Sequence, residues 1–235
     1  MLSAVGAAYA VWKTLEISLP TVAEALTGRL TIAKSDARLR YWSTELVRYA
    51  DIDLVVEGLE HVSRESAAVY MSNHQSHYDI PILYSIFPGT LRMVAKAELF
   101  RVPIWGRAMR AAGFVAVDRS GNREKAVAAM RTCAKAITDG VNIWIAPEGT
   151  RSPDGKLGKL KKGGFILARE TGADIVPIAI DGSRDILPKH SAQIMRGQKV
   201  RVKFGPKITV AGKETQALMQ EVRAFFVANV TGAED

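Results

Sequence analysis

The sequence has little cysteine and no long apolar run. Its 235 residues include a single cysteine, Cys133, which excludes an intramolecular disulfide and is typical of a reducing compartment. Cys133 lies within a helical pattern, which favours a place in the core over a role as a nucleophile. Lys13 and Glu16 interrupt the apolar N-terminal stretch, and Pro20 is expected to break it. It therefore falls short of the roughly 20 apolar residues of a spanning helix, and it lacks the basic start of a signal peptide.

Nucleotide-binding loops are also missing from the sequence. It contains no Gly-x-Gly-x-x-Gly or Walker A pattern, no internal repeat and no motif of a DNA- or RNA-binding domain. Positive charge is in excess, since 32 Lys and Arg residues against 24 Asp and Glu residues give a net charge of +8. Such a surface attracts nucleic acid, an anionic lipid surface or a phosphorylated substrate. Because nucleic-acid motifs are missing, we expect no nucleic-acid partner and favour the other two.

Residues 1–50 differ in character from residues 51–235. Between positions 34 and 49, apolar or aromatic side chains recur at helical spacing with basic ones beside them: Leu39, Trp42, Leu46 and Tyr49, with Arg38, Arg40 and Arg48. This composition suits a pair of amphipathic helices in a membrane interface that contains anionic lipid. The alternative is an amphipathic helix packed on its own domain. We divide the chain into a membrane-association segment, residues 1–50, and a second domain, residues 51–235.

Strands and helices alternate in the second domain. Short apolar runs predict strands at 54–58, 67–72, 91–95, 113–118, 142–146, 174–180 and 199–204, with a further candidate at 207–210. Helical patterns lie between them at 80–87, 103–112, 122–138 and 163–171, and a last one lies at 214–230. This alternation predicts an α/β fold with a mixed, largely parallel sheet flanked by helices. In such sheets, ligand-binding groups come from loops at strand ends.

A histidine and an aspartate five residues apart, His74 and Asp79, follow the predicted strand at 67–72. On one continuous helix they would lie roughly 140° apart. With His74 on a strand-to-helix turn and Asp79 in the first helical turn, the two side chains can meet, and Ser76 is expected to be the N-cap of that helix. The carboxylate would hold one ring nitrogen as N–H, leaving the other free to take a proton from a hydroxyl group.

Two other interpretations fit this segment. His74, His77 and Asp79 could be part of a metal site, although the chain has only four histidines and one cysteine, and we predict no metal. Alternatively, His74 could cap a helix without taking part in any chemistry.

Charged residues follow three of the predicted strands. Lys96 follows the strand at 91–95, Arg119 follows the strand at 113–118, and the run Pro147-Glu148-Gly149-Thr150-Arg151-Ser152 follows the strand at 142–146. Guanidinium groups bind phosphate with two hydrogen bonds, and lysine adds a point charge. A basic loop containing Lys161 then leads into a helix whose N-terminus can bind an anion. These loops predict a phosphorylated acceptor that also carries a hydroxyl group.

Taken in order, these blocks resemble the glycerolipid acyltransferase family, whose best-known members are the bacterial 1-acylglycerol-3-phosphate acyltransferases. The matching blocks are Asn73-His74-x4-Asp79, Gly113-Phe-Val-Ala-Val-Asp118-Arg119, Pro147-Glu148-Gly149-Thr150-Arg151-Ser152 and Ile175-Val-Pro177-Ile-Ala-Ile180. The resemblance implies that His74 is the base and that Asp79 orients it. The predicted substrate-binding residues are Asn73, Ser76, Lys96, Arg119, Glu148, Gly149, Thr150, Arg151, Ser152, Lys161 and Pro177. The chain departs from the family pattern at His77, where an aromatic or apolar residue is common, and at Leu160, where phenylalanine is common.

The resemblance also implies a reaction. An acyl group would pass from acyl-CoA or acyl-acyl carrier protein to the sn-2 hydroxyl of lysophosphatidate and give phosphatidate, without a cofactor. The implied location is the cytoplasmic face of the cell membrane, where the protein would be peripheral or monotopic. Another acceptor, glycerol-3-phosphate or lyso-ornithine lipid, is an alternative within the family. A non-catalytic membrane-binding protein and a metal-dependent hydrolase are alternatives of other classes.

Overall fold

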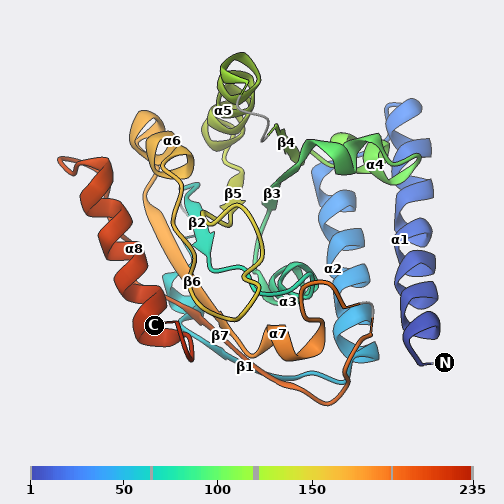
Figure 1. The fold of residues 1–235 in the computed structure, drawn as a ribbon. Helices are drawn as coiled ribbons and strands as arrows, with labels where there is room; N and C mark the ends of the chain where they lie inside the picture. The colour runs from blue at the N-terminus through green and yellow to red at the C-terminus, as the bar shows by residue number, and fades with distance from the viewer. Residues whose placement is uncertain (1, 64–65, 119–121, 192, 234–235) are drawn as a thin grey trace.

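The computed structural model describes residues 2–63, 66–118, 122–191 and 193–233. Seven strands form one sheet in the order β1-β7-β6-β2-β5-β3-β4 (Figure 1). The strands are β1 (Asp53–Glu57), β2 (Val69–Ser72), β3 (Leu91–Lys96), β4 (Val115–Val117), β5 (Asn142–Ile145), β6 (Ile175–Asp181) and β7 (Lys199–Phe204). Only β6 and β7 run antiparallel to each other, so the predicted mixed, largely parallel sheet is confirmed. Residues 207–210 form no strand, because this segment pairs only through an isolated bridge between Ile175 and Ile208.

Helices cover both faces of the sheet. They are α1 (Leu2–Leu26), α2 (Ile32–Tyr49), α3 (Asp79–Ile86), α4 (Trp105–Ala111), α5 (Arg123–Thr138), α6 (Gly163–Thr171), α7 (Ser183–Ile186) and α8 (Thr215–Asn229), with short 3-10 turns at Leu59–His61 and Ala97–Arg101. Side chains alternate across a strand. Tyr70 accordingly packs in the core under α2 and α3, while Val69 and Met71 pack with α5, α6 and α8 on the other face. All three are fully buried, as expected for the centre of a covered sheet.

The central strands bring distant parts of the sequence to one edge. Strand β2 lies between β5 and β6 and is parallel to both, with Met71 paired to Ile145 on one side and to Pro177 on the other. The carboxyl ends of parallel strands meet at the same edge of a sheet. The residues that follow β2, β5 and β6 are therefore neighbours in space.

The N-terminal helices pack beside this sheet. Helix α2 contacts α3, and α1 contacts both α2 and α4 (Figure 1). Helix α1 continues through Pro20 to Leu26, so the expected break at Pro20 is wrong. The Pro20 ring lies on the exposed side of α1, and the hydroxyl of Thr21 donates a hydrogen bond of 2.7 Å to the carbonyl of Ile17. Packing of α1 on α2 and α4 outweighs the loss of one backbone bond at the proline.

Among the described residues, no helix combines the length and the apolar character needed to cross a membrane. The assignment of residues 1–50 to a membrane-association segment stays a prediction.

A buried arginine fastens α2 to the sheet. Arg92 of β3 is almost fully buried, and its guanidinium donates a hydrogen bond of 2.5 Å to the Asp36 carboxylate of α2. The hydroxyl of Thr90 donates to the second oxygen of the same carboxylate, at 2.6 Å. Asp36 thus connects α2 to the segment that contains β3.

We expect Asp36→Ala to lower the free energy of unfolding by about 3 kcal/mol, because it leaves the buried Arg92 without its carboxylate. Asp139 forms an exposed ion pair with Lys135, so Asp139→Ala should cost at most about 0.5 kcal/mol. Urea unfolding of both variants measures the difference. Equal losses would show that the Asp36 contact does not hold α2 in place.

Candidate active site

The His74 and Asp79 side chains meet as the sequence predicted. His74 lies on the turn after β2, and Asp79 is the first residue of α3. The Nδ1 atom of His74 lies 2.7 Å from Oδ2 of Asp79. One detail of the turn differs from expectation: the N-cap of α3 is Tyr78, and the Ser76 hydroxyl accepts a hydrogen bond from the Tyr78 N–H at 3.2 Å. Ser76 therefore shapes the turn before the helix without being its N-cap.

The Asp79 carboxylate is fully buried and fully hydrogen-bonded. Its Oδ2 atom also accepts from the backbone N–H groups of Gln75, at 2.9 Å, and Ser76, at 3.1 Å. Its Oδ1 atom accepts from the hydroxyl of Ser183, at the start of α7. These donors satisfy both carboxylate oxygens inside the protein. When the His74 Nδ1–H donates to the Asp79 carboxylate, the Nε2 atom of His74 is left without a proton and can act as a base.

Ser183 was not predicted from the sequence. One residue, Gly182 with a φ of 90°, separates it from the end of β6, so it lies at the same sheet edge as His74. The position of a small polar residue three residues after the predicted strand at 174–180 was the available signal.

Glu148 braces the histidine turn. It is almost fully buried, and its two carboxylate oxygens accept from the backbone N–H groups of His74 and Gly158, each at 2.8 Å. Burial raises the pKa of Glu148, and the hydrogen bonds from Gly158 and His74 oppose this rise. The N–H of Ser152 donates to the His74 carbonyl at 2.8 Å. The turn that contains Glu148 and Ser152 therefore holds both peptide groups of His74.

Two cationic side chains, those of Arg151 and Lys161, lie at the turn formed by residues 147–152. The Arg151 guanidinium has no acidic partner in the described part of the chain, and burial lowers its pKa while the Asp79 charge opposes this. Lys161 lies over Gly149: a Cβ atom at Gly149 would stand 2.9 Å from the Lys161 Nζ atom. Gly149 also has a φ of 71°, which favours glycine. Among the described residues, neither Arg151 nor Lys161 has an acidic partner, and both lie near the candidate base, so this turn is suitable for an anion.

His77 lies between this turn and the apolar interior. Its side chain remains exposed, and desolvation by surrounding atoms, followed by the charges of Arg151 and His74, lowers its pKa. The imidazole of His77 is therefore neutral at pH 7. Within the described ranges, no three His, Cys, Asp or Glu side chains gather in a way that could hold a metal ion.

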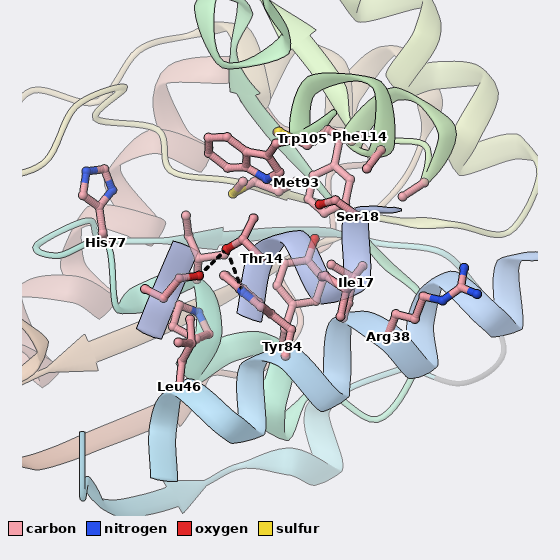
Figure 2. Close-up of a pocket in the computed structure, with 18 of the residues that line it drawn as sticks. Thr14, Ile17, Ser18, Arg38, Leu46, His77, Tyr84, Met93, Trp105 and Phe114 are labelled. Atoms are coloured by element: carbon pink, nitrogen blue, oxygen red, sulfur yellow. Dashed lines mark hydrogen bonds between the residues drawn. The ribbon is translucent and has the colours of Figure 1, made fainter. Parts of the chain in front are cut away.

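A cavity of about 530 Å³ begins beside His77. One wall comes from α1 and α2, and the other comes from α3, β3 and α4. Figure 2 shows His77 at one end of the cavity and Arg38 at the other, with Trp105, Met93 and Phe114 along one wall. The lining is mostly apolar; the Thr14 hydroxyl accepts from the Trp42 indole N–H at 3.1 Å and donates to the Ala10 carbonyl at 2.7 Å. The sequence did not reveal this cavity, because its walls come from segments that are distant in the chain.

The remaining predicted substrate-binding residues have varied surroundings. The buried side-chain amide of Asn73 exchanges two hydrogen bonds of 2.8 Å with the backbone of Ile180. The hydroxyl of Ser152 accepts from Gly155 N–H and donates to Asp154, Thr150 is exposed near Lys189, and Pro177 is buried in β6. Lys96 is exposed and pairs with Glu98 at 3.2 Å. Arg119 lies outside the described residues.

Cys133 is buried in the core, as the helical pattern predicted. Burial raises the pKa of its thiol to about 12, so the reactive thiolate is not formed at neutral pH.

Comparison with known proteins identifies similar sequences. The family model described as acyltransferase matches residues 53–181. A chloroplastic 1-acyl-sn-glycerol-3-phosphate acyltransferase of Arabidopsis thaliana, LPAT1, is 38% identical over 170 residues, which are 72% of this chain and 47% of that protein. The 1-acyl-sn-glycerol-3-phosphate acyltransferase of Pseudomonas aeruginosa is 30% identical over 210 residues, covering 89% of this chain and 79% of that protein. The chain spans about half the length of the plant relatives that it matches.

The fold also has a solved counterpart. The crystal structure of the 1-acyl-sn-glycerophosphate acyltransferase PlsC from Thermotoga maritima superimposes with a TM-score of 0.77 at 24% sequence identity. The match covers 95% of this chain and 94% of that chain, so it includes the two N-terminal helices as well as the sheet.

Glu148→Gln should lower the free energy of unfolding by about 1–3 kcal/mol, because the new amide nitrogen would face a backbone N–H in a buried position. The matched control is Glu98→Gln in the exposed pair with Lys96, which should change stability by no more than about 0.5 kcal/mol. Urea titration compares the two variants with the unmodified chain. An unchanged unfolding midpoint for Glu148→Gln would contradict the bracing role.

Proposed function

We propose that this chain, which belongs to the acyltransferase family, transfers a long-chain acyl group to lysophosphatidate and forms phosphatidate. The acyl donor is a thioester, either acyl-CoA or acyl-acyl carrier protein. One observation carries the proposal: the turn that holds the His74 and Asp79 pair also places His77 at the end of an apolar cavity, and it is hydrogen-bonded to a turn whose Arg151 has no acidic partner among the described residues. The plant and bacterial relatives are named as 1-acyl-sn-glycerol-3-phosphate acyltransferases, which supports the choice of acceptor.

The cavity suits the acyl chain. Its lining along α1 runs from Ala7 to Thr21, a span of about 21 Å at 1.5 Å rise per residue. Small side chains on this inner face, such as Ala7 and Ala10, leave room between α1 and the α/β domain. An acyl chain buried there loses its contact with water, which is the main favourable term for binding it.

The cationic turn suits the acceptor phosphate. The Arg151 guanidinium can donate two hydrogen bonds to one phosphate, and the Lys161 ammonium adds a point charge. Neither forms an ion pair with an acidic residue in the described part of the chain. Binding the phosphate here positions the acceptor hydroxyl for the His74 Nε2 atom. Arg119, which the resemblance places in the same role, stays a prediction.

In the proposed reaction, the acceptor hydroxyl attacks the thioester carbonyl carbon while the Nε2 atom of His74 takes the hydroxyl proton. The Asp79 carboxylate stabilises the imidazolium that results. Collapse of the tetrahedral intermediate breaks the carbon–sulfur bond, and the departing thiolate receives the proton from His74. The products are the ester and a free thiol, and no covalent acyl-enzyme is formed.

Backbone N–H groups near His74 are candidates for an oxyanion hole, but four of them already have partners. His74 N–H donates to Glu148, those of Gln75 and Ser76 donate to Asp79, and that of Tyr78 donates to Ser76. These groups build the turn and are not free for substrate. The proposed proton transfer does not depend on them.

The outer face of α1 suits a membrane surface. Large apolar side chains are exposed along it, namely Val5, Val11, Trp12, Leu15, Leu19 and Leu26. A row of this kind on an amphipathic helix lies in the headgroup region with its apolar side in the acyl layer. This would keep the cavity close to the pool of lipid substrates, with the protein peripheral or monotopic on the cytoplasmic face.

The decisive test follows thiol release from palmitoyl-CoA by purified protein in mixed micelles with lysophosphatidate. We expect release that requires lysophosphatidate, is lost in His74→Ala and is kept in the control His61→Ala. Both variants should unfold at urea concentrations close to that of the unmodified chain.

Other outcomes reassign the function. Release with glycerol-3-phosphate instead of lysophosphatidate would move the protein to the first acylation step, and release with a lyso-ornithine lipid would make an aminolipid the acceptor. Near-native release in His74→Ala would refute its assignment as the base. No release with any acceptor, from either donor, would refute the acyltransferase activity.

A further inference from the structure

The connection after α7 contacts the histidine turn, the turn that contains Arg151 and the apolar cavity. We call residues 187–191 the α7 connection. The Ser76 hydroxyl donates to the Leu187 carbonyl at 2.9 Å, which fixes the connection to the histidine turn. Leu187 also lines the apolar cavity. A further backbone bond, from Ser191 N–H to the Pro188 carbonyl at 3.0 Å, and a φ of 71° at His190 define a tight turn.

Lys189 extends from this connection to the cationic turn. Its Nζ atom donates to the Arg151 carbonyl at 2.8 Å and lies 3.5 Å from the Thr150 hydroxyl. The residue after Arg151, Ser152, donates its N–H to the His74 carbonyl. Lys189 is therefore two hydrogen bonds away from the backbone of the candidate base.

The ammonium group of Lys189 has no acidic partner within the described residues. Arg151, whose carbonyl Lys189 contacts, and Lys161, which lies over Gly149, carry the same charge and also lack acidic partners among the described residues. The nearest carboxylate on the turn, Glu148, is buried and directed at two backbone N–H groups. Three like charges around one turn repel one another, and a bound anion would relieve that repulsion.

We propose that Lys189 binds the phosphate of the acceptor together with Arg151 and Lys161. This inference rests on the proposed function. Lys189 lies outside residues 53–181, the part matched by the family model, so the family motifs do not assign it. Two donors of the ammonium are directed at Thr150 and Arg151, and the third is available for a phosphate oxygen.

The α7 connection gives this contact a second consequence. Leu187 lines the cavity proposed for the acyl chain, and Lys189 reaches the turn proposed for the acceptor phosphate. One short segment therefore contacts both proposed binding sites. Lys189 thereby positions the acceptor relative to the acyl chain.

The test is equilibrium binding of lysophosphatidate in detergent micelles to the full chain, measured by calorimetry for Lys189→Met and Lys189→Arg. We expect Lys189→Met to raise the dissociation constant about tenfold, which corresponds to about 1.4 kcal/mol. Lys189→Arg should restore most of the affinity. A monoacylglycerol with the same acyl chain, which lacks the phosphate, should bind all three proteins equally.

Lys135→Met removes the same charge from the exposed surface of α5 and serves as the control, with no change expected in either titration. Unchanged lysophosphatidate binding in Lys189→Met would overturn the proposal. Equal weakening for lysophosphatidate and the monoacylglycerol would also overturn it, because it would indicate a purely structural role. Weaker binding of palmitoyl-CoA alone would assign Lys189 to the donor phosphates instead.

Together, the binding titration and the turnover assay distinguish a failure of the Lys189 contact from a failure of the acyltransferase activity. If the unmodified chain binds lysophosphatidate in a Lys189-dependent way but releases no thiol, the proposed function fails and the phosphate contact stands. If it releases thiol and Lys189→Met binds and turns over normally, the function stands and this inference fails.

Discussion

The site depends on one carboxyl group, that of Asp79, which is fully buried. Removing Asp79 from water would be costly unless hydrogen bonds replaced its hydration. Four donors do so, from His74, Gln75, Ser76 and Ser183. These donors belong to two segments that are about a hundred residues apart in the chain, so satisfying one carboxylate fixes the turn after β2 against the turn after β6. The parallel pairing of β2 with β6 makes this geometry available.

Much of this arrangement could be predicted because it is local. The apolar runs gave the strands near their observed positions, and the spacing of His74 and Asp79 required a turn for the two side chains to meet. Pro20 was misjudged because a residue propensity says nothing about the packing of α1 on α2 and α4. Ser183, the Glu148 brace, the cavity and Lys189 arise from long-range pairing. No periodicity in the sequence reports which loops become neighbours when strands are ordered in a sheet.

Residues that belong to the same sequence motif have different roles in the structure. Glu148 and Asn73 direct their side chains at backbone groups, so they hold the site together. Arg151 and Lys161 form no ion pair within the described part of the chain, so their charges are available for a ligand. The same motif therefore contains residues that stabilise the site and residues that can bind a ligand. The hydrogen-bond partners of each side chain distinguish the two roles.

Helix α1 carries two independent sets of side chains. Positions 7, 10, 14, 17 and 21 face the cavity, whereas positions 5, 12, 15, 19 and 26 are exposed. Helical geometry keeps these sets apart, because they lie on different sides of the same cylinder. A substitution in one set can enlarge or shorten the cavity while the other set is untouched. Descendants of this chain could thus diverge in the size of molecule they accommodate without altering the surface that they present to their surroundings.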